Sequence, residues 1–234
     1  TIMRNIRLRA FSLRIGAEVG QVVSMLNSAS FSIEDGSGVE LLDEEAGFYI
    51  FRYHEQTEII DNITDVYGSP QRNSYLQYIS FKFYLIELSP GLLQVFIESP
   101  PKSLKQFVST LRRAFLGAFS FDAVKLDVYE WYKRFKDFSG VTRVRILKAQ
   151  SSIINIDDDS SFRIAVESSS NAIVQMERVV MDRKLSLDKL KLSFFYQHTE
   201  RVVELSGAFN IILSGWSAVE SLTFIMSVRS CESI

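Results

Sequence analysis

Alternating apolar and polar residues predict several β-strands along the chain. Residues 4–15 alternate isoleucine, leucine and alanine with arginine, which predicts a half-buried strand whose outer face carries cations. The segments 47–54 and 75–88 are rich in aromatic and β-branched residues and predict two more strands. Ser-Pro-Gly and the apolar segment 92–99 follow the second of them, so we expect a hairpin there.

Apolar residues at helical spacing predict helices between these strands, over residues 17–29, 103–115, 130–140 and 169–184. Ser169 or Ser170 is the expected cap of the last helix. The acidic segment 34–46 is expected to be a loop and residues 58–74 a linker. Further strands are predicted at 121–129, 141–156, 161–168, 186–197, 201–207, 208–215 and 221–228.

Two stretches of the chain resemble each other. VFIESPPKSLKQFV (residues 95–108) matches IAVESSSNAIVQME (residues 164–177) in its order of strand, polar junction and helix. Each lies inside a hairpin–helix–strand pattern, over residues 76–129 and 142–197. We therefore expect an α+β fold of mostly antiparallel sheets, with two similar hairpin–helix–strand units and helices covering one face. The expected domains are residues 1–138 and 139–234.

Composition bounds the class of protein. The chain has 234 residues, of which 47% are hydrophobic, which is enough for a sizeable core. Its single cysteine, Cys231, forms no internal disulfide and fits a reducing compartment, so a cytoplasmic location is expected. No apolar run reaches the roughly 18 to 20 residues of a membrane-spanning helix, so no membrane insertion is expected.

Charge is segregated along the sequence despite a formal net charge of −2. Residues 34–65 contain ten acidic residues and one basic residue, whereas residues 102–148 contain eleven basic and four acidic residues. One interpretation is that these regions neutralise each other in the fold. The other is that the basic region faces an anionic partner.

No residue cluster predicts catalysis. His54 is not followed by a second histidine at zinc-helix spacing, and His198 and Glu200 are more typical of a strand end than of a general-base pair. Asp157–Asp159 is expected to be a solvated turn rather than a Mg²⁺ or Ca²⁺ site. The chain has no phosphate-binding loop, nucleophile elbow or kinase motif. We expect no enzymatic activity, no cofactor and no metal.

The basic region is the candidate site. Cations spread over strands and helices can follow a phosphate backbone, and binding without a base-reading motif is expected to be independent of sequence and steeply salt-dependent. Trp131 and Tyr132 are expected to be packing residues rather than base-stacking ones. The candidate nucleic-acid-binding residues are Arg7, Arg9, Lys102, Lys105, Arg112, Arg113, Lys133, Arg134, Lys136, Arg143, Arg145 and Lys148.

Three segments carry a family resemblance, namely RNIRLRAFSLRI near the start, LIELSPGLLQVFIESPPKSLKQFVSTLRRAF, and MDRKLSLDKLKLSFFYQ. Their order resembles that of RdgC, a bacterial recombination-associated protein family that encircles DNA as a dimeric ring. The layout is also similar to DNA-binding components of phage-defence systems such as Kiwa. The resemblance implies non-catalytic binding of double-stranded DNA, by a homodimer, in phage defence or recombination.

Three functional hypotheses follow, of which the last and least favoured is an enzyme whose polar residues converge only in the fold. The first is a non-enzymatic, sequence-independent DNA-binding protein acting in phage defence or recombination. The second is a protein-interaction component of a toxin or defence assembly, in which the acidic stretch 34–65 contacts a protein partner and nucleic acid is not bound.

Overall fold

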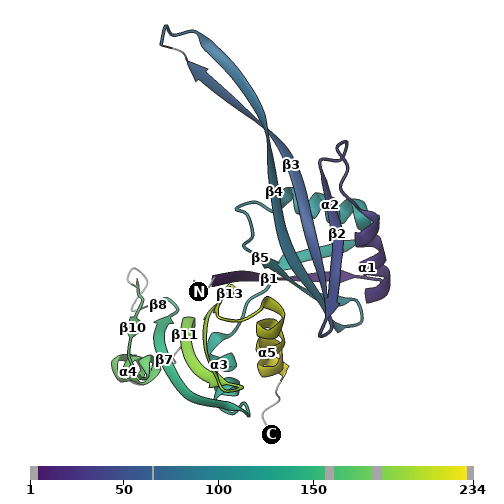
Figure 1. The fold of residues 1–234 in the computed structure, drawn as a ribbon. Coiled ribbons are helices and arrows are strands. Elements are labelled where there is room, and N and C mark those ends of the chain that lie inside the picture. Colours follow the sequence, from purple (N-terminus) through teal and green to yellow (C-terminus); the bar gives the residue numbers. More distant parts are fainter. Residues whose placement is uncertain (1–4, 65, 156–160, 181–185, 231–234) are drawn as a thin grey trace. The chain divides into compact units, whose positions relative to one another are not determined.

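The computed structural model of the chain describes residues 5–64, 66–155, 161–180 and 186–230, which form two compact units (Figure 1). The insert unit comprises Phe11–Asp122. The terminal unit comprises Ala123–Ile234 together with Thr1–Ala10. The units therefore divide after Asp122, whereas the sequence pattern predicts a domain boundary after residue 138.

Strand β1 (Asn5–Ile15) contributes to both units. Alternate residues are buried up to Ala10, and burial then resumes at Phe11 and continues at every second residue. Successive side chains of a strand point to opposite faces. The two halves of β1 therefore bury opposite faces, each in the core of its own unit.

The insert unit is an antiparallel sheet covered by two helices. Its strands follow the order β1-β5-β4-β3-β2, and β6 pairs with β1. Helices α1 and α2 contact each other, and both contact β2, so they cover the same face of the sheet (Figure 1). The bounds of these elements are β2 (Ser37–Glu45), β3 (Phe48–Thr64), β4 (Pro70–Ser89), β5 (Leu92–Glu98), β6 (Phe119–Ala123), α1 (Val19–Ser28) and α2 (Lys105–Phe115).

Helix α2 supplies the centre of this core, and its prediction over residues 103–115 is confirmed. Phe107, Leu111 and Phe115 recur every four residues, so they share one buried face. The Phe107 ring contacts four other aromatic rings, with centroid distances from 5.2 Å to 5.7 Å. The helix ends where Leu116 adopts a left-handed conformation with φ of 49°.

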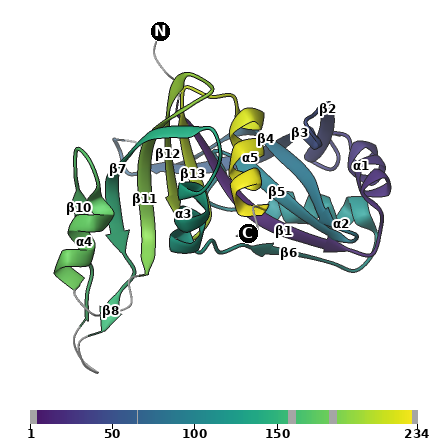
Figure 2. The ribbon, with the colours of Figure 1, turned by 90° about the horizontal axis from the view of Figure 1, so that it is seen from below.

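The terminal unit pairs its strands in the order β10-β7-β11-β12-β13-β1 and packs helices against one face (Figure 2). Phe135 of α3 and Phe224 of α5 contact the ring of Phe194 on β11 at centroid distances of 5.0 Å and 5.3 Å. Strands β8 and β9 form a separate two-stranded sheet. The bounds are β7 (Val141–Ser151), β8 (Ile154–Asn155), β9 (Ser161–Phe162), β10 (Ala165–Glu167), β11 (Leu187–Tyr196), β12 (Thr199–Ser206), β13 (Asn210–Ser214), α3 (Val128–Lys136), α4 (Ala172–Val180) and α5 (Ala218–Ser230).

The predicted α+β fold with two similar hairpin–helix–strand units is wrong. Among the described residues, eleven strands belong to one antiparallel sheet, and five small helices are additions to it. The supposed copies also differ in pairing. The closing strand β6 of the first pairs with β1, whereas the closing strand β11 of the second pairs directly with β7. The two stretches match because each contains a strand, a polar junction and a helix in that order. This local order does not determine which strands pair with each other.

Two segments expected to lack regular structure are strands. The predicted loop 34–46 contains the edge strand β2. Residues 58–64 and 70–74 of the predicted linker 58–74 belong to the 17-residue β3 and the 20-residue β4. These two strands pair continuously from Tyr49 opposite Leu85 to Thr64 opposite Pro70. The polar composition of the segment 58–74 predicted a linker because it shows no apolar face to bury. Two strands can nevertheless form backbone hydrogen bonds with each other when their side chains are exposed.

The C-terminal segment 221–228 is helical, not a strand. Helix α5 begins after Ser217, whose Oγ accepts a hydrogen bond from the Glu220 amide, while the Glu220 carboxylate accepts one from the Ser217 amide. This capping box is visible in the sequence as Ser-Ala-Val-Glu. Helix α4 is capped by the side chain of Asn171, not by Ser169 or Ser170. The predicted strand 121–129 ends at Ala123, and α3 begins at Val128.

Two sequence features lie outside the described residues, namely Asp157–Asp159 and Cys231. Of the helices that are described, none combines the length and the apolar composition that crossing a bilayer requires.

Candidate nucleic-acid interface

The twelve predicted cations are divided between the units. Four of them lie in the insert unit, on α2 or just before it, and eight lie in the terminal unit. The expected single basic track over residues 102–148 is therefore two separate sets of cations, one in each unit.

The outer face of the terminal unit's sheet gathers five of the predicted residues with two that were not predicted. Paired residues of neighbouring strands point to the same face. Lys148 of β7 pairs with Lys191 of β11, which pairs with Glu204 of β12. Glu204 pairs with Ile212 of β13, which pairs with Arg7 of β1. The cations of this "basic face" are Arg7, Arg9, Arg143, Arg145, Lys148, Lys189 and Lys191. Arg143 lies in a β-bulge of β7 and belongs to this face through its contact with the Phe195 ring.

The opposite face of the same strands is the core. Leu190, Leu192 and Phe194 alternate with the lysines of β11 and are buried. Phe135 of α3 and Phe224 of α5 pack on that side through Phe194. The helices therefore leave the basic face open, and Arg7, Arg143, Arg145 and Lys189 are exposed on it.

Three carboxylates partly neutralise the basic face. The Nζ atom of Lys148 lies 2.7 Å from Glu167 Oε1, and this hydrogen bond raises the pKa of Lys148 and lowers that of Glu167. Glu200 accepts hydrogen bonds from Ser193 and from Arg145, which lower the pKa of its carboxyl group. Glu204 is the third carboxylate of this face. The paired strands therefore carry seven cations and three carboxylates on the basic face. A surplus of four positive charges remains.

Lys189 and Lys191 were not predicted as nucleic-acid-binding residues, although the sequence pattern that places them on the solvent side is present. The segment 186–197 is confirmed as a strand, and Lys-Leu-Lys-Leu within it alternates cations with core leucines. In a sheet with one buried face, this alternation places both lysines on the solvent side. Because they lie outside the cation-rich stretch 102–148, the distribution of charge along the sequence does not indicate them.

Three predicted cations on α3 lie on the helix-covered side instead. Lys133 forms an ion pair with Glu130 on its own helix, and Arg134 donates a hydrogen bond to the backbone carbonyl of Arg229. The ammonium of Lys136 lies 5.6 Å from the centroid of the Tyr132 ring. Trp131 and Tyr132 are buried, which confirms that they are packing residues.

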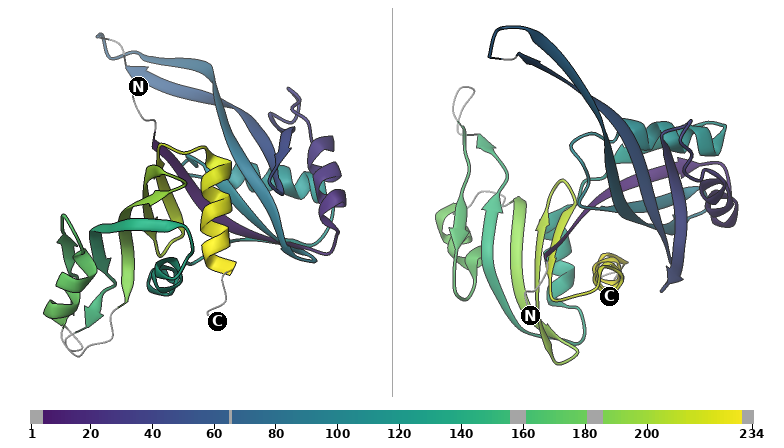
Figure 3. Two further views of the ribbon diagram at one scale, coloured as in Figure 1. Left: turned by 60° about the horizontal axis from the view of Figure 1, so that its bottom comes forward. Right: turned by 45° about the horizontal axis from the view of Figure 1, so that its top comes forward.

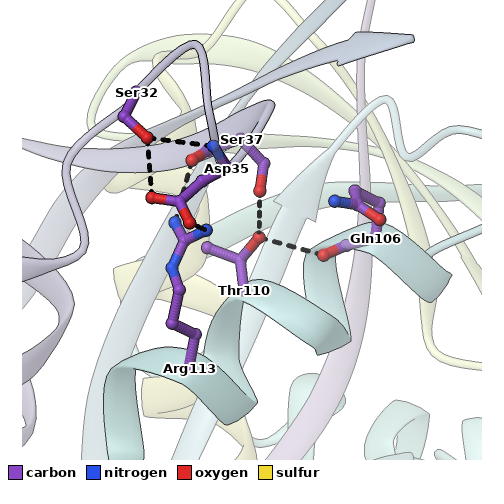
Figure 4. Close-up of polar contacts among 6 residues, drawn as sticks. All are labelled: Ser32, Asp35, Ser37, Gln106, Thr110 and Arg113. Atoms are coloured by element: carbon purple, nitrogen blue, oxygen red, sulfur yellow. Dashed lines mark hydrogen bonds and ion pairs between the residues drawn. The ribbon is translucent and has the colours of Figure 1, made fainter.

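Arg113 of the insert unit is engaged in a partly buried polar cluster (Figure 4). Its guanidinium lies 3.0 Å from Asp35 Oδ1 and donates to the carbonyl of Ser37 at 2.9 Å. The Ser37 hydroxyl in turn lies 2.8 Å from the Thr110 hydroxyl, and both side chains are buried. Arg113 therefore ties α2 to the start of β2, whereas Lys102, Lys105 and Arg112 are exposed.

We expect Arg113→Ala to lower the free energy of unfolding by about 1–2 kcal/mol, because the Ser37 carbonyl and Asp35 lose a charged donor. The neighbouring Arg112→Ala removes an exposed cation and should change it by less than about 0.5 kcal/mol. Urea denaturation followed by far-UV circular dichroism measures both. Equal effects of the two substitutions would show that the cluster does not stabilise the unit.

A cavity of about 530 Å³ opens beside the basic face at the turn between β11 and β12. The guanidinium carbon of Arg143 lies 5.1 Å from the centroid of the Phe195 ring. The lining residues are Gly140, Thr142, Arg143, Phe195, Tyr196, Gln197 and His198. Among the described residues that line the cavity there is no carboxylate that could pair with His198 for general-base catalysis.

The remaining candidates for chemistry are dispersed. His54 lies in the insert unit, with Nε2 3.8 Å from Glu40 Oε2. Among the residues that the structure describes, no group of three or more histidine, cysteine, aspartate or glutamate side chains could hold a metal ion.

Comparison with known proteins does not assign a family. No protein-family model matches the sequence, and no curated protein is similar to it. Among solved structures, the chain is similar to the crystal structure of the di-domain ARO/CYC StfQ from the steffimycin biosynthetic pathway, with 11% sequence identity over 94% of this chain and 93% of that one. The TM-score is 0.22, so this likeness supports no statement about fold or activity.

Proposed function

We propose that the chain is a non-enzymatic, sequence-independent DNA-binding protein whose contact surface is the basic face. The observation that carries the proposal is the convergence of seven cations from β1, β7 and β11 on one open sheet face within one compact unit. Lysine and arginine contacts to phosphates supply affinity without reading bases, and their number sets the salt dependence.

The spacing of the cations supports duplex DNA as the ligand. Neighbouring strands lie about 4.8 Å apart, so β11 and β1, with β12 and β13 between them, are separated by about 14 Å. The intervening strands carry Glu204 and Ile212 and no cation on this face. Two cationic rows at this separation match two phosphate backbones across a major groove about 12 Å wide. The process, phage defence or recombination, is proposed from the RdgC-like layout alone.

Random-sequence duplex DNA with a fluorescent label tests the proposal by anisotropy at several salt concentrations. We expect the triple substitution Arg7→Ala, Lys189→Ala and Lys191→Ala to weaken binding. It should also flatten the plot of log K against log salt by about 0.9 for each phosphate that no longer meets a cation. Lys105→Ala with Arg112→Ala, on α2 of the insert unit, is the matched control and should leave the slope unchanged.

Two outcomes contradict this proposal. One is that the unmodified chain does not bind the duplex at about 50 mM salt, where phosphate contacts are strong. The other is that the α2 control weakens binding as much as the triple substitution does, which would move the contact surface to the insert unit.

A second candidate function is contact with a basic protein through the acidic stretch 34–65. The observation that favours it is the position of Glu40, Asp43, Glu44 and Glu45 on β2, which is the edge strand of its sheet. Edge strands are sites of strand addition, but charges along them also prevent unwanted pairing. A chain that binds no DNA but retains this edge would favour the second candidate.

A further inference from the structure

The β3–β4 hairpin extends well beyond the sheet that supports it, and this extension is its arm (Figures 1 and 3). β2 pairs with β3 only as far as Glu55, and β5 pairs with β4 only from Phe83 onward. The arm comprises residues 56–64 and 70–82. Among the described strands, residues 56–64 pair only with 70–78, and residues 79–82 pair only with 52–55 of β3. A two-stranded ribbon without a third strand or a covering helix is marginally stable in water.

The arm exposes large apolar side chains on both of its faces. Tyr75, Leu76 and Tyr78 of β4 are 53%, 51% and 67% exposed, and adjacent residues of a strand point to opposite faces. Ile60 and Ile63 of β3 are also exposed. A soluble surface rarely gathers so many apolar side chains unless another molecule covers them.

The two open edges of the arm differ in charge. The β3 edge carries Glu58 and Asp61, and the same acidic residues disfavour contact with nucleic acid. The β4 edge from Asn73 to Phe81, NSYLQYISF, carries no charged residue, no proline and no glycine. Open, uncharged strand edges rich in aromatic residues pair readily with another strand.

We propose that the β4 edge of the arm pairs with the same edge of a second copy of this chain, in antiparallel orientation about a two-fold axis. In a two-fold interface each surface must be complementary to itself. An uncharged edge meets this condition because no like charges come to lie opposite each other. A register centred on Leu76, for example, places Arg72 opposite Ser80. The β3 edge would bring acidic residues close to their own copies.

This pairing converts two exposed ribbons into one four-stranded sheet. Each copy forms new backbone hydrogen bonds with the outward-facing groups of β4, and Tyr75, Leu76 and Tyr78 acquire cross-strand partners on both faces. The dimer contact lies entirely in the insert unit, whereas the proposed DNA contact lies in the terminal unit. The two proposals can therefore fail independently.

Light scattering after size-exclusion chromatography tests the association. The unmodified chain should elute with twice the 26.7 kDa mass of one chain. Leu76→Lys with Tyr78→Lys should give a monomer, because the new charges face each other across the two-fold axis. Ile60→Lys with Ile63→Lys, which places two lysines at exposed sites on β3, should remain dimeric. Circular dichroism confirms that both variants are folded.

A cysteine scan locates the contact. In a background with Cys231→Ser, single cysteines are placed at Ser74, Leu76 and Tyr78 and oxidised. Directly opposed residues of antiparallel strands are about 4.5–5.5 Å apart between Cα atoms, which suits a disulfide. We expect a cross-linked dimer from a cysteine at or beside the two-fold axis and none from Ile60→Cys. A monomeric unmodified chain at about 100 µM (a concentration that populates even modest dimers), or cross-linking through β3 instead of β4, overturns the proposal.

Discussion

Replacing Phe107 with alanine should lower the free energy of unfolding of the insert unit by about 3–5 kcal/mol. The Phe107 ring is fully buried and packs against the rings of Tyr53, Phe81, Phe83 and Phe121 in edge-to-face geometry. Its removal costs the transfer free energy of the ring, leaves a cavity between α2 and the sheet, and removes four ring–ring interactions.

Far-UV circular dichroism during urea denaturation measures this effect. Both tryptophans, Trp131 and Trp216, belong to the terminal unit, so their fluorescence reports on that unit separately. Phe107→Leu keeps much of the volume and should cost less than half as much. A decrease below about 1 kcal/mol for Phe107→Ala would mean that this aromatic cluster is not the centre of the core.

Replacing Gly38 with alanine should cost about 3 kcal/mol or more through backbone crowding. A β-carbon at Gly38 would lie 2.1 Å from the Phe31 nitrogen and 2.4 Å from the Ser30 carbonyl carbon. These atoms belong to the backbone between α1 and β2, which is held by the hydrogen bond from Val39 N to Ala29 O. No side-chain rotation relieves the clash, so the chain segment itself has to move.

Gly20→Ala is the matched control and should have the opposite sign. Gly20 lies in the first turn of α1, and a β-carbon there meets no atom within 4 Å. Alanine is favoured over glycine in a helix, so we expect the free energy of unfolding to rise by about 0.5–1 kcal/mol. Thermal unfolding of both variants, followed by circular dichroism, shows whether each substitution lowers or raises the stability of the chain. Similar destabilisation at both positions would show that Gly38 has no special packing role.

Local patterns were sufficient wherever a segment buries one face. The strand over 186–197 and the helix over 103–115 were found because apolar residues recur every second or every fourth residue. The same method found the strand over 75–88 but failed for residues 58–64 and 70–74 of the arm, which bury little and carry no clean alternation. It also failed for α5, which is apolar on nearly all sides and carries its helix signal only in the capping box.

The candidate site was partly predictable for the same reason. Arg7 and Arg9 are two residues apart, and that spacing places both on one strand face. The same spacing predicts this for Arg143 and Arg145, but a β-bulge separates them and Arg143 has a left-handed backbone with φ of 52°. Nothing in the sequence indicates that β7, β11 and β1 present these faces together. Nor does it show that Arg113 binds Asp35 or that Arg145 binds Glu200, because these partners are 78 and 55 residues apart.

For a strand that buries one face, the order of amino acids alone is enough to tell which side chains point to the core and which point to solvent, because that choice follows from a period of two residues. It does not tell which strands are neighbours, which cations are paired with carboxylates or which strand edges are left open. Those outcomes appear only in the folded chain, since they depend on contacts between residues far apart in sequence, where many pairings satisfy the same local pattern.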